Sequence, residues 1–453
     1  MRKLRPYQQE ALDYLKENHG GALFMQMRLG KTIVCIRYVH GLLGTSTPPY
    51  RFCTLVVAPV EGLWAWKREL ALEGVEPVVL VGSRAQRLRL LWGSPNARWF
   101  LINYEGFLSI QEELGQKRWD FCILDESRRI ANPKSKTTKA LLHMKDDGST
   151  TRIVLAGEPA PESPLEYFTQ YAFLNGEFCG CKNYWQFRNN FFHELAPHEW
   201  VPIPARLDSL KAAIRYNAFF LTRKQAGLRD NKIYETRALK FPPFIQKMYD
   251  EVKRDFLLTL HNKVVATTKW VPVQYTWLQQ LSSGFLGEKL LWDGKIKQLI
   301  DLLEGELKNE QVVVWYKFNA PLFETSLQLS RRKIEHRKIV GEENRVDREA
   351  SIDLFRAGSV RVLLCQVKCG KTALDLSNSS TAVYFSNSHA LEERIQSEDR
   401  ILNPAKHEPL LYLDLITEGT VEEDIVELLR DKKCEAQYFR SRLLNTLRQE
   451  VLV

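Results

Sequence analysis

The tripeptide Gly-Lys-Thr at residues 30–32 could close a phosphate-binding loop. It follows an apolar run and a short loop, and residues 31–43 after it have apolar positions at helical spacing. In this order of strand, loop and helix, backbone N–H groups and the helix N-terminus face the phosphates. Lys31 then reaches the outer phosphates and Thr32 binds magnesium, although Met25 replaces the glycine that usually begins such a loop. We therefore expect a nucleoside triphosphate to bind here.

A pair of acids ends a second apolar run. The segment Cys-Ile-Leu-Asp-Glu, residues 122–126, closes with Asp125 and Glu126. Beside a phosphate loop, Asp125 can hold magnesium while Glu126 polarises the attacking water. A solvated strand end is the alternative, but it explains one acid more readily than two. The two motifs together predict hydrolysis of a nucleoside triphosphate, with Lys31, Asp125 and Glu126 as catalytic residues.

A second Gly-Lys-Thr, at residues 370–372, requires a separate explanation. The segment after it contains Ser-Asn-Ser-Ser, which is too short and polar for the long helix of a phosphate loop. The next apolar run ends in Ser386 and Asn387, so no acid stands there to hold a second magnesium ion. The sequence therefore predicts one nucleotide site and not two.

The elements that position these residues are short apolar runs that alternate with helix-like stretches in two parts of the chain. In the first part the expected strands are residues 22–25, 54–59, 99–103, 121–126 and 152–157. In the second part they are residues 311–316, 361–366, 381–386 and 410–416. Continuous apolar strands between helices are typical of a buried parallel sheet, so we expect two α/β lobes.

The middle of the chain, about 160–290, differs because it is rich in aromatic and basic residues at helical spacing. Two prolines in residues 199–207 predict a loop or a short hairpin. We expect the following division. Lobe one spans residues 1–235 with an aromatic and basic insertion at about 175–220, a helical connection spans 236–284, and lobe two spans 285–453.

The composition limits the class of protein. Hydrophobic residues make up 44% and aromatic residues 11% of the 453, which excludes a disordered chain. The net charge of +9 favours a polyanionic partner such as nucleic acid, with an ordinary basic enzyme surface as the alternative. No apolar run reaches the length of a membrane span, and the N-terminus lacks the apolar core of a signal peptide. We therefore expect a cytoplasmic protein without membrane contacts.

One cysteine and histidine cluster raises the question of zinc. Cys179, Cys181, His193 and His198 lie within twenty residues of one another, but their spacing matches no common zinc site. Ordinary packing is the expected role of these side chains.

Six segments resemble, in order, the motif series of superfamily-two helicases. They are similar above all to the Snf-type branch, whose members translocate on double-stranded DNA. The segments are Leu4–Leu12, Met27–Thr32, Leu55–Pro59, Asp125–Lys136, Leu155–Phe168 and Gln396–Ile401. The resemblance runs from residue 4 to about residue 430, and it implies an α/β fold with two RecA-like lobes that bind ATP and Mg²⁺.

The resemblance also implies a set of nucleotide-binding residues. Gln8 is expected to read the adenine edge, which makes ATP the nucleotide. The implied cofactor-binding residues are Arg5, Gln8, Arg28, Leu29, Gly30, Lys31, Thr32 and Gln396, with Thr32 and Asp125 as the magnesium ligands.

The second lobe is expected to supply an arginine finger. Residues 388–406 have the pattern of a helix in which Gln396, Arg400 and Asn403 lie on one face. Arg400 is the expected finger, which stabilises charge on the transferred phosphoryl group. The family normally has a second arginine where Asn403 stands. Three explanations stay open: Arg400 suffices, Lys406 or Arg394 substitutes, or hydrolysis is slow.

The resemblance places the second Gly-Lys-Thr in the fifth motif of the family, which faces DNA. Loops after the strands of both lobes are expected to bind the DNA backbone and to give salt-dependent binding. The implied DNA-binding residues are Pro59, Asn103, Tyr104, Lys317, Lys368, Gly370 and Lys371.

A compact chain with these motifs resembles phage-encoded DNA remodellers. The expected activity is ATP-dependent translocation on duplex, forked or four-way-junction DNA, with fork regression and branch migration in repair or recombination. We expect the protein to be a monomer in the cytoplasm. If the chain is phage-encoded, this is the cytoplasm of the host. One alternative is a helicase that tracks single-stranded DNA or RNA. The other is a decayed motor that only binds nucleic acid, suggested by Ala156, Glu158 and Asn403 in place of usual residues.

Overall fold

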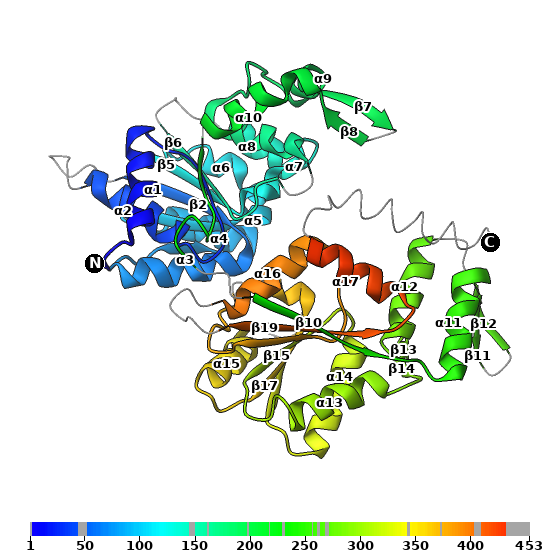
Figure 1. Cartoon of the computed structure of the whole chain (residues 1–453). Coiled ribbons are helices and arrows are strands. Elements are labelled where there is room, and N and C mark those ends of the chain that lie inside the picture. Colours follow the sequence, from blue (N-terminus) through cyan, green and yellow to red (C-terminus); the bar gives the residue numbers. More distant parts are fainter. Residues whose placement is uncertain are drawn as a thin grey trace. The chain divides into compact units, whose positions relative to one another are not determined.

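The chain folds into two compact units, Met1–Arg229 and Asp230–Val453, here called lobe one and lobe two (Figure 1). The structure is a computed structural model. It describes residues 2–43, 52–144, 150–160, 163–196, 199–216, 218–228, 232–255, 257–260, 263–267, 271–341, 345–371, 374–402 and 409–431. Within these residues, no helix combines the length and the apolar character that crossing a membrane requires.

Lobe one is built on a seven-stranded sheet in the order β3-β4-β2-β5-β6-β1-β9, with all neighbours parallel. Its strands are β1 (Gly21–Met25), β2 (Thr54–Ala58), β3 (Val78–Leu80), β4 (Trp99–Asn103), β5 (Phe121–Asp125), β6 (Thr151–Ala156) and β9 (Ala218–Leu221). The carboxyl ends of parallel strands meet at one edge of a sheet, so the loops after β1 and β5 lie at the same edge.

Helices cover both faces of this sheet. They are α1 (Pro6–Glu17), α2 (Lys31–Leu43), α3 (Val60–Leu72), α4 (Arg84–Trp92), α5 (Tyr104–Ser109), α6 (Gln111–Leu114), α7 (Lys136–Leu142), α8 (Tyr167–Asn175), α9 (Tyr184–Phe191) and α10 (Leu207–Tyr216). Leu23 and Met25 of β1 face the apolar cluster with α1, α2 and α3. Ala22 and Phe24 face the cluster with α5, α7, α8 and α9. This alternation buries the strand on both sides.

Lobe two has a six-stranded parallel sheet in the order β10-β19-β18-β15-β17-β16. Its strands are β10 (Lys232–Leu239), β15 (Val312–Tyr316), β16 (His336–Ile339), β17 (Val362–Gln366), β18 (Thr381–Tyr384) and β19 (Leu410–Thr417). Its helices are α11 (Pro243–Asp255), α12 (Val271–Ser282), α13 (Gly294–Glu304), α14 (Asn319–Arg331), α15 (Arg345–Arg356), α16 (Leu391–Ile401) and α17 (Val421–Asp431). The predicted class, two parallel α/β lobes, is confirmed.

The described residues also form three short hairpins. They are β7 (Phe192–Ala196) with β8 (Glu199–Pro202), β11 (Leu257–Leu260) with β12 (Lys263–Thr267), and β13 (Phe285–Leu286) with β14 (Lys289–Leu290). The first is the hairpin that the two prolines in residues 199–207 predict.

The lobe boundary differs from the predicted one. Strand β10 pairs with β19 along its whole length, from Lys232 opposite Leu410 to Leu239 opposite Thr417. Residues 232–235 therefore belong to lobe two and not to lobe one, because a strand belongs with the sheet that satisfies its backbone hydrogen bonds. The predicted connection at 236–284 also packs into lobe two, where α11 and α12 share an apolar cluster with α17.

Candidate functional site

The first Gly-Lys-Thr closes a loop between β1 and α2, at the carboxyl edge of the lobe-one sheet. Gly30 has a φ of +83°, and a Cβ on it would lie 2.3 Å from the side-chain nitrogen Nε2 of Gln8. Helix α2 begins at Lys31, so the unpaired N–H groups of its first turn follow directly after the loop. The strand, loop and helix that a phosphate-binding site requires are therefore present in the predicted order.

Gln8 ties the N-terminal segment to this loop. Its Nε2 donates to the Leu29 carbonyl at 3.0 Å, and its Oε1 accepts from the Arg5 N–H at 3.0 Å. The Leu29 side chain is fully buried in the apolar cluster, so only its backbone can contribute to a nucleotide site. The Arg5 guanidinium donates to the Tyr7 hydroxyl at 3.4 Å. The structure thus brings the predicted Arg5, Gln8, Leu29 and Gly30 together.

Lys31 and Asp125 lie within electrostatic reach of each other. Lys31 Nζ donates to the Met25 carbonyl at 2.8 Å, across its own loop. Burial raises the pKa of Asp125, whereas the Trp66 N–H, the Lys31 ammonium and the Glu126 N–H oppose that rise. Trp66 Nε1 donates to Oδ2 of Asp125 at 2.9 Å, and the Glu126 N–H donates to Oδ1 at 3.0 Å. Both carboxylate oxygens of Asp125 are therefore held in place.

These residues fit a magnesium-bound nucleoside triphosphate. Carboxylate and hydroxyl oxygens are the ligands that Mg²⁺ prefers, and Asp125 and Thr32 supply one of each. Glu126 follows directly on Asp125 with a φ of +52°, in the left-handed region where a glutamate is uncommon. Such backbone geometry gathers at functional sites, where the surrounding structure holds it.

Gln170 of α8, which the sequence motifs did not indicate, connects the segment that follows the acid pair to residues 155–159. Ser127 Oγ donates to Oε1 of Gln170 at 2.6 Å, and Nε2 of Gln170 donates to the Pro159 carbonyl at 2.7 Å. Arg128 pairs with Glu166 at 3.5 Å. Trp66 was missed as well, because an aromatic residue in an apolar helix has the pattern of an ordinary core position.

The predicted DNA-binding residues of lobe one have different surroundings. Pro59 stands at the N-terminus of α3, and Asn103 ends β4 with its Nδ2 donating to Glu105 at 2.7 Å. Tyr104 is buried, and its hydroxyl donates to the Asp125 carbonyl at 2.8 Å. The Tyr104 side chain therefore supports the acid pair, and contact of Tyr104 with DNA stays a prediction.

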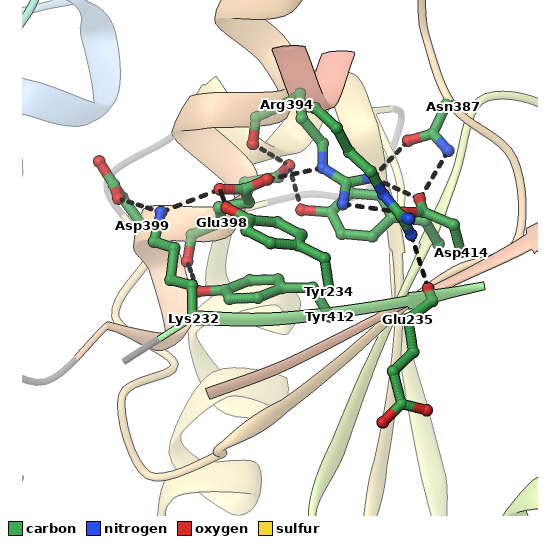
Figure 2. A network of polar contacts seen from close by, with 12 residues as sticks. Lys232, Tyr234, Glu235, Asn387, Arg394, Glu398, Asp399, Tyr412 and Asp414 are labelled. Carbon is green, nitrogen blue, oxygen red and sulfur yellow. Dashed lines mark hydrogen bonds and ion pairs between the residues drawn. The ribbon is translucent and has the colours of Figure 1, made fainter. Parts of the chain in front are cut away.

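Arg394 lies at the centre of a buried network of polar contacts in lobe two (Figure 2). Its guanidinium donates to Glu398 at 2.8 Å, to Asn387 at 2.8 Å and to both oxygens of Asp414, at 2.5 and 3.2 Å. It also lies 3.5 Å from the centroid of the Tyr384 ring. Arg394 is therefore fully engaged inside lobe two, which removes it as a substitute for the missing second arginine. Asn403 and Lys406 lie outside the described residues.

Arg400 and Gln396 lie on α16, four residues apart and thus on one face, as predicted. The Arg400 side chain is partly exposed, whereas Gln396 is buried. Gln396 Nε2 donates to Glu392 at 2.8 Å, and its Oε1 has no partner among the described residues. A buried carbonyl oxygen without a partner costs free energy and marks a position where a ligand can bind.

Lys317 and Lys368 of lobe two lie close enough to influence each other. Lys317 follows β15, and its Nζ donates to Gln279 of α12. Burial lowers the pKa of Lys317 to about 8; Glu393 opposes this and Lys368 adds to it. Lys368 is exposed on the 3-10 turn Val367–Lys371, which also holds Gly370 and Lys371. Residues 374–380 contain no helix, so the described part of the second Gly-Lys-Thr region does not form a phosphate loop.

The aromatic insertion forms a stack of cations and rings. The Arg188 guanidinium lies 3.8 Å from the centroid of the Trp200 ring and 4.8 Å from that of Trp185. Lys134 Nζ lies 5.2 Å from the Trp185 centroid, and 45% of Trp185 is exposed. The same insertion contains Cys181, whose side chain is buried. Among the described residues, no cluster of His, Cys, Asp and Glu side chains could hold a metal ion.

Two family models match the chain. The SNF2-related domain matches residues 7–254, and the helicase conserved C-terminal domain matches residues 294–404. Together they cover both lobes.

Three curated relatives show the extent of the similarity. The TATA-binding protein-associated factor mot1 of Aspergillus fumigatus is 25% identical and covers 95% of this chain, which spans 26% of that protein. The DNA repair and recombination protein RDH54 of Saccharomyces cerevisiae strain S288c is 24% identical over 93% of this chain and 49% of its own length. The ISWI chromatin-remodeling complex ATPase ISW1 of the same strain is 22% identical over 95% of this chain and 40% of its own length. The chain thus spans a quarter to a half of these relatives.

A solved structure is similar over nearly the whole chain. The Sulfolobus solfataricus SWI2/SNF2 ATPase core in complex with dsDNA is 18% identical, with a TM-score of 0.46. The match covers 97% of this chain and 95% of that one.

Proposed function

Because the chain belongs to the SNF2-related family of helicase-like ATPases, we propose that it is an ATP-dependent DNA translocase that remodels branched DNA. The tasks are fork regression, Holliday-junction branch migration and the unwinding of forks. The observation that carries the ATP-dependent part of the proposal is the assembly of Lys31, Asp125 and Glu126 at one edge of the lobe-one sheet. A decayed motor, which no longer hydrolyses ATP, is not expected to retain all three of these side chains.

The chemistry of hydrolysis follows from these side chains. The loop before α2 and the Lys31 ammonium bind the phosphates, and Asp125 with Thr32 holds Mg²⁺. Glu126 accepts a proton from the attacking water. Arg400 stabilises the charge that develops on the transferred phosphoryl group. Each of these groups stands on a strand end, a loop or a helix of its lobe.

DNA as the partner is supported by charge and by the relatives. Lys368 is exposed beside Lys317, and the chain carries a net charge of +9. Among the relatives, RDH54 carries the name of a DNA repair and recombination protein. The same proposal includes that the protein is a monomer and that it acts in the cytoplasm, which is the host cytoplasm for a phage-encoded chain. The second candidate, a helicase that tracks single strands, differs in the nucleic acid that stimulates it.

The test is steady-state ATP hydrolysis without nucleic acid and with single-stranded DNA, single-stranded RNA, blunt duplex, a fork or a four-way junction. Lys31→Ala serves as the inactive control. Stronger stimulation by duplex, fork or junction than by single strands supports the proposal. Stimulation by single strands alone identifies the conventional helicase, and no turnover on any substrate identifies a decayed motor.

Trp66→Phe is expected to weaken the magnesium site while leaving a smaller aromatic ring in the core. The change removes the N–H that donates to Asp125, so the carboxylate loses a fixed orientation and its pKa rises further. We expect the Mg²⁺ concentration for half-maximal ATP hydrolysis to rise by about tenfold, the lower range for loss of such a support. Trp64→Phe, two residues earlier in α3, is the control. An equal effect of both changes would show that helix packing and not the N–H is responsible.

The lowered pKa of Lys317 gives DNA binding a pH dependence. Below about pH 8 Lys317 is charged and can pair with a phosphate, and above it the charge is lost. DNA affinity at low salt should therefore fall by about threefold from pH 7 to pH 9.5, the size of one partly exposed ion pair. Equilibrium binding measures this. Lys317→Arg, which stays charged, should not show the drop, and a drop of the same size in that variant would exclude Lys317 as its source.

A further inference from the structure

Strand β10 is where the chain enters lobe two, directly after the division at residues 229 and 230. It is the edge strand of the lobe-two sheet, so its backbone pairs with one neighbour only, β19. Side chains from the start of β10 reach α16, the helix that carries Arg400 (Figure 2). The entry strand and the arginine-finger helix are thus connected directly.

The connection is made through the carboxylate of Glu398. Lys232 Nζ donates to Oε2 at 2.9 Å, and the Tyr234 hydroxyl donates to the same oxygen at 2.8 Å. Arg394 Nε donates to Oε1 at 2.8 Å, one turn earlier on α16. Lys232 Nζ also lies 3.6 Å from Oδ1 of Asp399. The Tyr234 ring stacks on Tyr412 with 5.3 Å between centroids, which fixes its hydroxyl.

These charges are buried and balanced. The side chains of Lys232, Glu398 and Asp399 are only 4%, 2% and 3% exposed. Burial alone would raise the pKa of Glu398, but Arg394 and Lys232 lower it to about 2, so the carboxylate stays charged. Separating the buried Lys232 ammonium from Glu398 and Asp399 is costly, because the ammonium would lose both of these carboxylate partners. The start of β10 and this turn of α16 must therefore move together.

Arg400 follows immediately on the two acids that Lys232 holds. Positions 394 and 398 share one face of α16, whereas positions 396 and 400 share another. Because a helix is rigid over two turns, a shift or rotation at Glu398 and Asp399 changes the direction in which Arg400 projects. The Arg400 carbonyl also accepts from the Leu376 N–H at 3.0 Å, so the end of the helix is anchored.

We propose that Lys232 is a positioning residue for Arg400, and that the entry strand β10 sets the orientation of the arginine finger through the Lys232–Glu398–Asp399 contact. The inference rests on the proposed ATP hydrolysis. It adds that the segment joining the lobes controls the rate of that hydrolysis, because any displacement of the joining segment is carried to Arg400.

The first test compares Lys232→Met, Lys232→Arg and Arg237→Met. Arg237 is a matched control, since it lies on the same strand but pairs with Glu235 and Glu306 and is 32% exposed. For Lys232→Met, we expect kcat of DNA-stimulated hydrolysis to fall by about 10- to 100-fold, as for a slightly misplaced catalytic group. The KM for ATP should stay within about twofold, because the phosphate loop is unchanged. Lys232→Arg should keep most of the activity, and Arg237→Met should behave as the parent protein.

A double-variant cycle separates positioning from simple loss of structure. In an Arg400→Ala background, Lys232→Met should cause no further loss of kcat, because the residue on which it acts is gone. The same fold-loss in both backgrounds would overturn the inference. If the parent protein hydrolyses no ATP at all, the proposed function fails instead, and the two failures are thereby distinguished.

A measurement without nucleotide completes the test. Amide hydrogen exchange at residues 396–402 should be faster in Lys232→Met than in Arg237→Met, and the rest of lobe two should be unchanged. If Lys232→Met does not fold, Tyr234→Phe takes its place, since it removes only the hydroxyl that donates to Glu398. Unchanged exchange and unchanged kcat in a folded variant would disprove the role of this contact.

Discussion

Replacing Glu126 by glutamine is expected to lower the rate of ATP hydrolysis by about 10²- to 10⁴-fold, the usual contribution of a general base. Glutamine has nearly the same shape as glutamate, but its amide does not take a proton from water. Glu126 directly follows the strand that holds Asp125, and its backbone lies in the left-handed region, with a φ of +52°. The substitution leaves this backbone position unchanged, and only the chemistry of the side chain changes.

Binding and hydrolysis should separate in this variant. Equilibrium binding of ATP should stay close to that of the parent protein, because Lys31, Thr32 and Asp125 are intact. Glu112→Gln, at an exposed position of helix α6 in the same lobe, is the matched control and should hydrolyse ATP normally. Full activity of Glu126→Gln would mean that another group activates the water, and the assignment of the acid pair would be wrong.

Replacing Lys295 by methionine is expected to destabilise lobe two by about 3–5 kcal/mol, the range for breaking a buried ion pair. Lys295 is fully buried, and its Nζ donates to the two carboxylate oxygens of Glu422 at 2.7 and 2.8 Å. Burial lowers the pKa of Lys295 and raises that of Glu422, and their attraction opposes both shifts. Without Lys295, the Glu422 carboxylate stays in the core, where the Thr417 N–H is its remaining donor among the described residues.

The effect should be confined to lobe two. Thermal unfolding followed by limited proteolysis should show earlier cleavage within residues 230–431, while residues 2–228 resist as before. The double variant Lys295→Met with Glu422→Leu should recover much of the loss, because two apolar groups can pack together. Lys297→Met is the control, since its ion pair with Asp293 is exposed and contributes at most about 1 kcal/mol. A loss of stability equal to that of the control would show that the pair contributes little.

The inner strands of both sheets could be predicted from the sequence, and the edge strands could not. Every run predicted as a strand is a strand, within one or two residues, because a parallel strand buried on both faces must be continuously apolar. The four sheet strands that the pattern missed are β3, β9, β10 and β16, and they are the edges of the two sheets. An edge strand pairs on one side and needs no continuous apolar run. β10, for example, alternates in Lys-Ile-Tyr-Glu-Thr-Arg-Ala-Leu.

The site shows a similar division. Residues with a fixed place in a local motif, such as Lys31 in its loop and Asp125 at its strand end, could be found because the motif itself sets their geometry. Trp66, Gln170 and Lys232 could not, because each reaches its partner through the tertiary fold and its own neighbours carry no signal. For the same reason the sequence could not decide whether Arg394 acts as a second arginine finger. Its partners Asp414 and Asn387 come from other elements.

The pairing of β10 with β19 also has a consequence for the order in which the protein acquires its structure. Among the described strands of lobe two, β10 is the first to leave the ribosome and β19 is the last, so β10 stays without this neighbour until the other described strands have been synthesised. The strands described in lobe one, by contrast, are complete by residue 221. Lobe one can therefore fold, and bind nucleotide, while the chain is still growing. The contact of Lys232 with α16 forms late, so lobe two, which carries the proposed arginine finger, should complete its structure only after β19 has been synthesised.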